Sequence, residues 1–294
     1  MISIRRGVEQ GLALIAVLWI VASLSLLAVG LSATTRSELR GAQSVQSAAV
    51  ATAAGDAAIQ MAILEMLSTG TQLDSLVYKT YLFQGREIRV EAAPANGMIN
   101  INLASDVLLQ DLFVFGAGME EAAAEALAQR VIDWRSPESA LEAEDYEAAG
   151  VAFRPRGEPF AYPEDLLQVL GVSFDVYDKV RGLITTHGDA PGVHPLAATV
   201  DVLKVLARGD ADLAARIAAG RDEQDPAIDL TGLTQQHFSG GFTRVYRIAA
   251  HVPIGERRIV REHWVDLGQS SEHNGMQWKT LGVSAARSFE GLSN

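Results

Sequence analysis

The longest hydrophobic feature of the chain is an uncharged run over residues 12–33, LALIAVLWIVASLSLLAVGLSA. As a helix, these 22 residues rise about 33 Å, which matches the roughly 30 Å hydrocarbon core of a bilayer. Arg5 and Arg6 precede the run, and positive charges stay on the cytoplasmic side of such helices. The pattern therefore predicts one transmembrane helix, with a cytoplasmic N-terminus and the remainder of the chain exported.

The next segment, residues 34–70, predicts a continuation of the same helix outside the membrane. It contains no proline and places Ile59, Ile63 and Met66 at spacings of four and three, which is the period of one helix face. Gly70 suits the residue that ends a helix. We expect this stem to pack on a folded head, although the same pattern is typical of any amphipathic core helix.

Alternating apolar and polar positions, which are typical of strands, occur in two separate blocks. The first block, residues 75–98, contains a Gln84-Gly85 turn followed by an alternation over residues 87–92. The second block, residues 240–268, predicts a hairpin that turns at residues 253–256. We therefore expect the two blocks to form one small antiparallel sheet.

Residues 99–239, between these blocks, predict a series of short helices. Pro163 suits the first turn of one helix, and Thr199 and Asp210 suit the N-caps of two others. Glycines suited to helix ends follow at positions 171, 209 and 220. The predicted fold class is α+β, with a long N-terminal helix on a small antiparallel sheet and a large all-α domain inserted between strands. The polar tail, residues 269–294, predicts a flexible C-terminus.

The composition limits the kinds of partner and chemistry. Of the 294 residues, 48% are hydrophobic, so the chain can bury a sizeable core. Lys and Arg number 24 against 36 Asp and Glu, which gives a net charge of −12. Such a charge opposes binding to nucleic acid, because affinity for phosphate comes from basic side chains. The absence of cysteine excludes disulfides, thiolate metal sites and cysteine nucleophiles.

Motifs of enzyme active sites are missing from the sequence. It contains no His-Glu-x-x-His, no Gly-x-Ser-x-Gly and no phosphate-binding loop. The six histidines have no metal-ligand spacing, and only His251 and His263 fall on strands predicted to be adjacent. We therefore predict that the protein is not an enzyme and has no catalytic or cofactor-binding residues.

The segment before the hydrophobic run resembles the leader of a type IV prepilin. Residues 5–11 read RRGVEQG and are followed directly by Leu12, so the resemblance implies cleavage by prepilin peptidase between Gly11 and Leu12. The fifth mature residue, usually Glu in such proteins, is Ala16 here. A subunit without this Glu cannot neutralise the N-terminal amine of a preceding subunit, which favours the first position in a filament. A plain uncleaved signal anchor is the alternative, because an ordinary signal peptide has a shorter apolar core.

Residues 163–180 resemble a helix-hairpin-helix, a module that often holds DNA phosphates. That use requires a Gly-x-Gly turn and flanking basic residues. Here Ser173 replaces the second glycine, and Asp175 and Asp178 follow. A structural role is therefore favoured, and a membrane-anchored periplasmic DNA-binding protein is the alternative function.

Five further segments, in order, resemble one family. They are residues 97–103 (GMININL), 131–134 (VIDW), 142–146 (EAEDY), 158–160 (EPF) and 164–172 (EDLLQVLGV). Together with the leader, they are similar to protein K of the general secretion pathway, a minor pseudopilin family of type II secretion systems. The resemblance extends over residues 5–268, and its specificity lies in the order of the segments.

This resemblance implies an organisation and a function. Residues 1–11 become the leader, 12–33 the transmembrane half of the helix and 34–70 its periplasmic stem. Residues 75–98 and 240–268 become a pilin-like β domain that carries the α domain. The family acts at the pseudopilus tip, priming or capping assembly and supporting export of folded proteins across the outer membrane. Implied partners are minor pseudopilins I and J, the major pseudopilin, prepilin peptidase and the inner-membrane assembly platform, with the head in the periplasm and no nucleic acid bound.

An acidic stretch after the VIDW segment suggests one metal site. Some members of the family bind calcium in this region, and calcium prefers six to eight oxygen ligands. The candidate ligands are Asp133, Glu138, Glu142, Glu144 and Asp145. The alternative is a solvated acidic loop that keeps the protein soluble.

Overall fold

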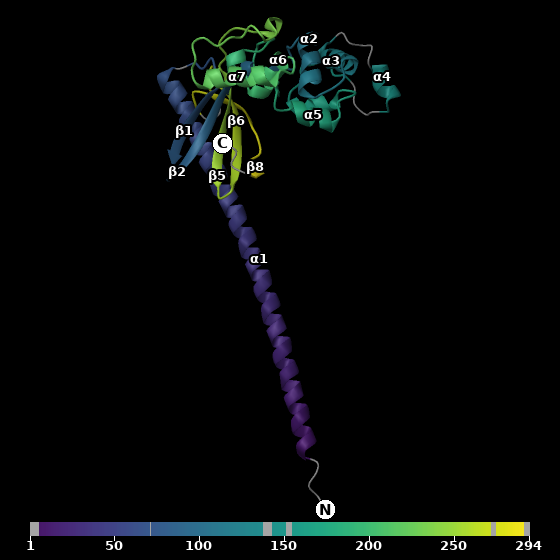
Figure 1. The fold of residues 1–294 in the computed structure, drawn as a ribbon, viewed down its shortest axis with the longest axis vertical. Coiled ribbons are helices and arrows are strands. Elements are labelled where there is room, and N and C mark those ends of the chain that lie inside the picture. The colour runs from purple at the N-terminus through teal and green to yellow at the C-terminus, as the bar shows by residue number, and fades with distance from the viewer. Residues whose placement is uncertain (1–5, 71, 138–142, 151–154, 272–274, 291–294) are drawn as a thin grey trace, which may run out of the picture. The chain divides into compact units, whose positions relative to one another are not determined.

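The computed structural model describes residues 6–70, 72–137, 143–150, 155–271 and 275–290. The chain divides into two compact units, residues 1–53 and 54–294, each of which is described by itself. Helix α1 (Arg6–Thr69) provides the described part of the first unit and continues into the second (Figure 1). Its last residue precedes Gly70, whose φ of +63° ends the helix at the predicted place.

The second unit contains an antiparallel sheet with the strand order β1-β2-β5-β6-β7, and β8 also pairs with β6. Gly85 and Gly255, both at positive φ, lie in the turns that connect the two strands of each hairpin, β1 to β2 and β5 to β6. Strands β2 and β5 are neighbours although the whole α domain separates them in sequence. The bounds are β1 (Val77–Phe83), β2 (Arg86–Pro94), β5 (Val245–Ile254), β6 (Arg257–Asp266), β7 (Lys279–Val283) and β8 (Arg287–Glu290).

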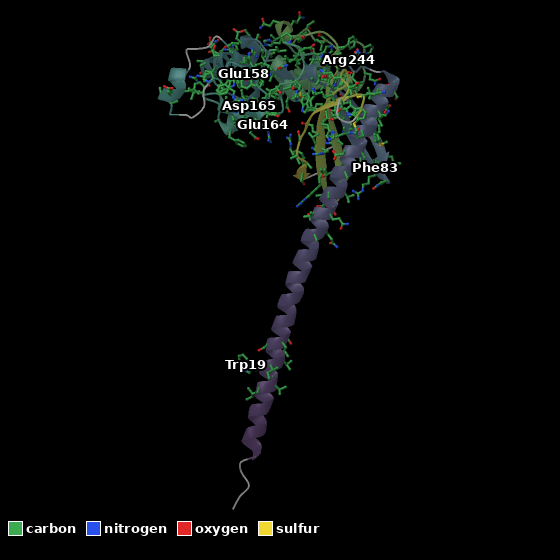
Figure 2. All side chains as sticks on the ribbon, turned by 180° about the vertical axis from the view of Figure 1, so that it is seen from behind. Trp19, Phe83, Glu158, Glu164, Asp165 and Arg244 are labelled. Carbon is green, nitrogen blue, oxygen red and sulfur yellow. The ribbon has the colours of Figure 1, made fainter. Side chains whose placement is uncertain are left out.

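One face of this sheet is apolar and lies against the C-terminal part of α1. Side chains alternate along the strands, so Val90, Ile248 and Ala250 share this face and are buried. On the helix, Ile59 and Ile63 are fully buried. Figure 2, which views the molecule from behind, shows the helix in front of the strands. The predicted packing of the stem on a sheet is thus present within this unit.

The α domain occupies the sequence between β2 and β5. Ser105, Ser173, Thr199 and Asp210 accept hydrogen bonds from backbone N–H groups in the first turns of four helices. One continuous apolar core fills the domain. The elements are η1 (Ala95–Gly97), β3 (Ile99–Asn100), α2 (Asp106–Asp111), η2 (Leu112–Gly116), α3 (Glu121–Arg135), α4 (Ala143–Ala148), η3 (Pro163–Gln168), α5 (Phe174–Val180), β4 (Ile184–Thr185), η4 (Pro195–Ala197), α6 (Val200–Leu206), α7 (Ala211–Asp222) and η5 (Gln235–His237).

The segment GMININL forms the junction between the sheet and the α domain. Gly97 lies against the backbone of Ala197, and a Cβ atom at position 97 would be 2.1 Å from the carbonyl oxygen of Ala197. Asn100 Nδ2 donates a hydrogen bond to the carbonyl of Gly188 at 3.0 Å, and Asn100 Oδ1 accepts one from the N–H of Asn102 at 2.9 Å. The segment therefore contacts two distant parts of the chain, one through its backbone at Gly97 and one through the side chain of Asn100.

The structure confirms the α+β class and corrects several details. The C-terminal tail is not simply flexible, because residues 279–283 and 287–290 form strands that pair with β6. The inserted domain is not all-α, since β3 and β4 form a short parallel pair. The helix predicted from Pro163 is a 3-10 helix, and Gly220 lies inside α7 rather than at its end. Each error arises where tertiary contacts outweigh local propensity.

Candidate functional site

The N-terminal helix presents an uninterrupted apolar surface. Ala16 and its neighbours from 15 to 25 are all exposed, with Trp19 at 71% and Leu18 at 69% (Figure 2). Large exposed apolar side chains on every side of a helix require lipid or other helices to cover them. Gly11 and Leu12, the predicted cleavage residues, lie within α1 and their side chains are outside the described ones.

Two stretches of α1 are apolar in the described part of the chain. Residues 42–69 are long and apolar enough to cross a membrane, but part of this stretch is buried in protein. It contains Ile59 and Ile63, which pack against the sheet. The shorter stretch 15–25 falls inside the predicted span of residues 12–33. The C-terminal part of the first stretch therefore packs in a protein core, and the second stretch belongs to the membrane-crossing candidate predicted from the sequence.

A polar contact that sequence reasoning missed fixes α1 to the sheet. Asp56 Oδ1 accepts hydrogen bonds from Arg261 Nε at 2.6 Å and from His263 Nε2 at 2.8 Å. Beside it, Gly55 allows close approach, because a Cβ atom there would lie 3.0 Å from that of Arg261. His263 is largely buried and His251 lies on the other sheet face, so the two histidines on adjacent strands do not form a metal site. An isolated aspartate in an alanine-rich helix was the only signal available.

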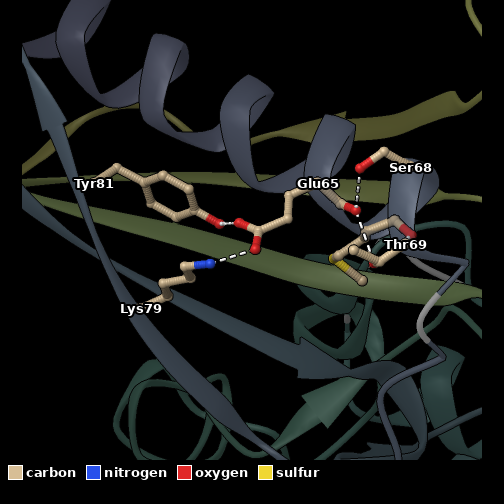
Figure 3. Close-up of polar contacts among 6 residues, drawn as sticks. Glu65, Ser68, Thr69, Lys79 and Tyr81 are labelled. Carbon is tan, nitrogen blue, oxygen red and sulfur yellow. Dashed lines mark hydrogen bonds and ion pairs between the residues drawn. The ribbon is translucent and has the colours of Figure 1, made fainter.

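A second contact holds the last turn of the helix to the edge strand β1 (Figure 3). Glu65 pairs with the Lys79 ammonium and accepts a hydrogen bond from Tyr81 Oη at 2.8 Å. The carbonyl of Glu65 accepts bonds from the hydroxyls of Ser68 and Thr69. Hydrogen bonds from Lys79 and then Tyr81 lower the pKa of Glu65, and burial raises the pKa of Tyr81. These contacts hold the C-terminal end of α1 against strand β1.

The candidate calcium ligands are only partly described. Asp133 lies on α3, where its Oδ1 accepts a hydrogen bond from Gln129 Nε2 at 2.9 Å. Glu138 and Glu142 fall outside the described residues, and Glu144 and Asp145 lie in α4 with side chains outside them. The described side chains include no group of three metal ligands. Calcium binding stays a prediction, and a calcium-dependent rise in melting temperature that a Glu142→Gln/Glu144→Gln variant loses would test it.

Trp134, next to Asp133, belongs to an aromatic cluster in the α-domain core. Its ring lies 6.0 Å from that of Tyr146 and 6.3 Å from that of Phe160. Tyr146 Oη accepts a hydrogen bond from the N–H of Leu170 at 2.8 Å, and Asn102 Oδ1 accepts one from that of Phe160 at 2.7 Å. All five sequence segments that resemble the family thus meet in or beside this cluster, which gives them a packing role.

The hairpin of η3 and α5 carries acidic side chains on both of its helices. The carboxylate of Asp165 accepts hydrogen bonds from the N–H groups of Ala161 and Tyr162, so a carboxylate already occupies this helix start. Glu164 lies beside it (Figure 2), and Lys179 is paired with Asp175. With such a charge balance, no contact among the described residues of this hairpin favours DNA binding.

A cleft of about 890 Å³ separates α5 from the β6–β7 side of the sheet. Burial, with a contribution from Glu164, raises the pKa of Tyr177 in its wall to about 12. His187 also lines it, and burial lowers the pKa of this imidazole. In the described part of the chain, the histidine rings that form side-chain hydrogen bonds bond to aspartates, Asp111 and Asp56.

Comparison with known proteins supports the family resemblance. Residues 97–189 match the family model of type II secretion system (T2SS) protein K, a span that includes the GMININL, VIDW and hairpin segments. The crystal structure of the GspK–GspI–GspJ complex from the enterotoxigenic Escherichia coli type 2 secretion system contains a chain with the same fold. That match has a TM-score of 0.52 and 15% identity over 87% of this chain and 100% of the other. No curated protein matches the chain. Residues 97–189 are thus similar to type II secretion protein K in sequence, and the whole chain is similar to the E. coli chain in fold.

Proposed function

We propose that this chain is a minor pseudopilin that occupies the tip of a type II secretion pseudopilus, where it primes or caps assembly and supports export of folded proteins across the outer membrane. The observation that carries the proposal is Ala16. In an apolar filament core, an N-terminal amine needs a carboxylate from the next subunit, since an unpaired charge there is expensive. A subunit with alanine at this position provides no such carboxylate. Only the first subunit can lack it, because no preceding subunit presents an amine to be neutralised.

The apolar helix surface has two successive roles in this proposal. Before assembly, residues 12–33 anchor the protein as a single pass in the inner membrane, with the head in the periplasm. After assembly, the same side chains, including Trp19 and Leu18, pack against helices of neighbouring subunits. Both environments cover an apolar surface that is exposed in the isolated chain.

Minor pseudopilins I and J are the proposed partners at the tip. Support comes from the E. coli complex, in which a chain of similar fold is found with GspI and GspJ. The major pseudopilin and the inner-membrane assembly platform complete the proposed set, because a tip subunit must connect to the filament below it.

The first experiment tests processing by prepilin peptidase. We expect the chain isolated from membranes that contain the peptidase to begin at Leu12 with a methylated amine, and the chain from membranes without it to begin at Met1. Gly11→Val should retain the leader, whereas Gly7→Ala, the matched control, should be cleaved. If both membranes yield residues 1–11, the protein is a plain signal-anchored protein and the pseudopilin assignment fails.

The second experiment tests the position in the filament. Immunogold labelling of sheared pseudopili should place the head at one end of each filament. The ratio of this chain to the major pseudopilin should fall as filaments lengthen. Labels distributed along the filament would contradict a tip position while leaving the processing result intact.

A further inference from the structure

The sheet has a second face, opposite α1, whose side chains are charged. Because strand partners share a face, the register places Arg89 and His251 on it together, with Arg258 on the next strand. We call this the open face. Its polar and aromatic members include Tyr78, Glu87, Arg89, Glu91, Arg247, His251, Arg258, Glu262, Trp264, Arg287 and Phe289.

Three nitrogen atoms at the centre of the open face are buried without a hydrogen-bond partner. They are Arg247 Nε, His251 Nδ1 and Arg258 Nε. Burial lowers the pKa of His251 most, Glu91 opposes this shift, and Arg258, Arg89 and Arg247 add to it. The imidazole is therefore surrounded mainly by positive charge, and nearby donors lack acceptors.

The carboxylates of the open face do not neutralise all of its arginines. Glu91 and Glu262 both pair with Arg247. Among the described residues, Arg89 and Arg258 have no carboxylate partner. Each guanidinium instead lies over an aromatic ring, 4.3 Å from the centre of Tyr78 for Arg89 and 5.5 Å from that of Phe289 for Arg258. Glu87 also lies on this face, exposed and nearer the hairpin turn.

We propose that the arginine cluster of the open face (Arg89, Arg247, His251 and Arg258) receives an acidic segment of a protein partner, whose carboxylates pair with Arg89 and Arg258. The chain as a whole carries a charge of −12. An acidic segment is therefore attracted to this local positive cluster and not to the protein surface in general. Guanidinium groups bind carboxylates through two parallel hydrogen bonds, and stacking on a ring holds the group in place beforehand. The proposal concerns the surface alone and does not depend on the tip position.

A peptide binding measurement tests the surface directly. The probe is a fluorescein-labelled peptide of alternating Asp and Glu, titrated into the full chain in neutral detergent micelles at low salt. We expect it to bind at least ~10-fold more tightly than an Asn/Gln peptide, because a pair of charge-assisted hydrogen bonds is worth that factor. Added salt should weaken the binding. The resonance of His251 should titrate at a higher pH with the acidic peptide present, because carboxylates favour its protonated form.

Matched variants separate this surface from general electrostatics. Arg89→Glu/Arg258→Glu should lose at least ~10-fold in affinity, whereas Arg216→Glu on α7, an exposed arginine, should keep it. Arg89→Gln/Arg258→Gln serves if the charge reversal prevents folding, as judged by circular dichroism. Equal binding by the open-face and Arg216 variants, or equal binding of the two peptides, would overturn the proposal. So would dimerisation of the chain through this face, which would make the occupant a second copy. None of these readouts depends on cleavage at Gly11, so the two proposals fail separately.

Discussion

The α domain and the helix-covered sheet fill their cores with side chains of different sizes. The α domain buries large aromatic residues, including Trp134, Tyr146 and Phe113. Under α1, the buried helix residues are mostly small, with Ala51, Ala54, Gly55, Ala58 and Ala62 beside Ile59, Ile63 and Met66. Small residues bring a helix backbone close to its sheet, so polar contacts such as that of Asp56 come within reach.

This difference teaches that the two regions are specified in different ways. In the α domain, the shapes of large side chains and a close backbone contact at Gly97 determine the packing. In the helix–sheet layer, a smooth surface permits sliding, and the ion pairs of Asp56 and Glu65 fix the register of the helix. Substitutions at the close backbone contact and at the ion pairs should therefore lower the free energy of unfolding by different amounts in the two regions.

The largest effect is expected for Gly97→Ala. The new Cβ atom would lie 2.1 Å from the carbonyl oxygen of Ala197 and 2.4 Å from its carbon, and backbone atoms cannot move aside as a flexible side chain can. We expect a loss of about 3 kcal/mol or more in the free energy of unfolding. Denaturant unfolding of the full chain in detergent measures it. Gly182→Ala is the control, because nothing lies within 4 Å of its Cβ position; equal losses would contradict the close-packed junction.

Asp56→Ala should have an intermediate effect. It removes the acceptor for Arg261 Nε and His263 Nε2, and leaving largely buried donors unpaired costs about 1–3 kcal/mol. The same unfolding measurement applies. Asp56→Asn, which keeps one acceptor oxygen, should lose less, and Glu125→Ala on α3, an exposed position, should change stability by about 0.5 kcal/mol or less. A loss for Asp56→Ala no larger than that of Glu125→Ala would show that the pair does not fix the helix.

The smallest effect is expected for Glu65→Gln, and it should depend on pH. The pKa of Glu65 lies below its ordinary value of 4.5 in the folded protein. Its contribution is therefore present above that value and is lost as pH falls through the lowered pKa. Because the pair is exposed, we expect about 0.5 kcal/mol or less at neutral pH. Stabilities of the two proteins should converge in acid, and a difference that grows in acid would contradict the lowered pKa.

Local patterns predicted much of this fold, because the signals are strong where one residue determines the backbone. Gly70, Gly85 and the caps Thr199 and Asp210 fall where they were expected. The strands β7 and β8 were missed, since most of their described residues are exposed, and an edge strand needs only one partner. The pairing with β6 is a tertiary effect that no short window contains.

Contacts between distant residues were the other limit of prediction. Asp56 and His263 are separated by 207 positions, and Asp111 and His237, which form a buried pair at 2.8 Å, by 126. Nothing in the local sequence of either histidine indicates its partner. The open face was missed for the same reason, because Arg89 and Arg258 come together only through the register of three strands.

The α domain leaves and rejoins the sheet at one point. Pro94 at the end of β2 pairs with Tyr246 on β5, and Asn96 Nδ2 donates a hydrogen bond to the carbonyl of Gly241 at 2.9 Å. The insert therefore takes the place of a single hairpin loop. Since lengthening a loop adds closure entropy only slowly, the sheet tolerates a whole domain at this position, and evolution could exchange or enlarge that domain without redesigning the strands that carry it.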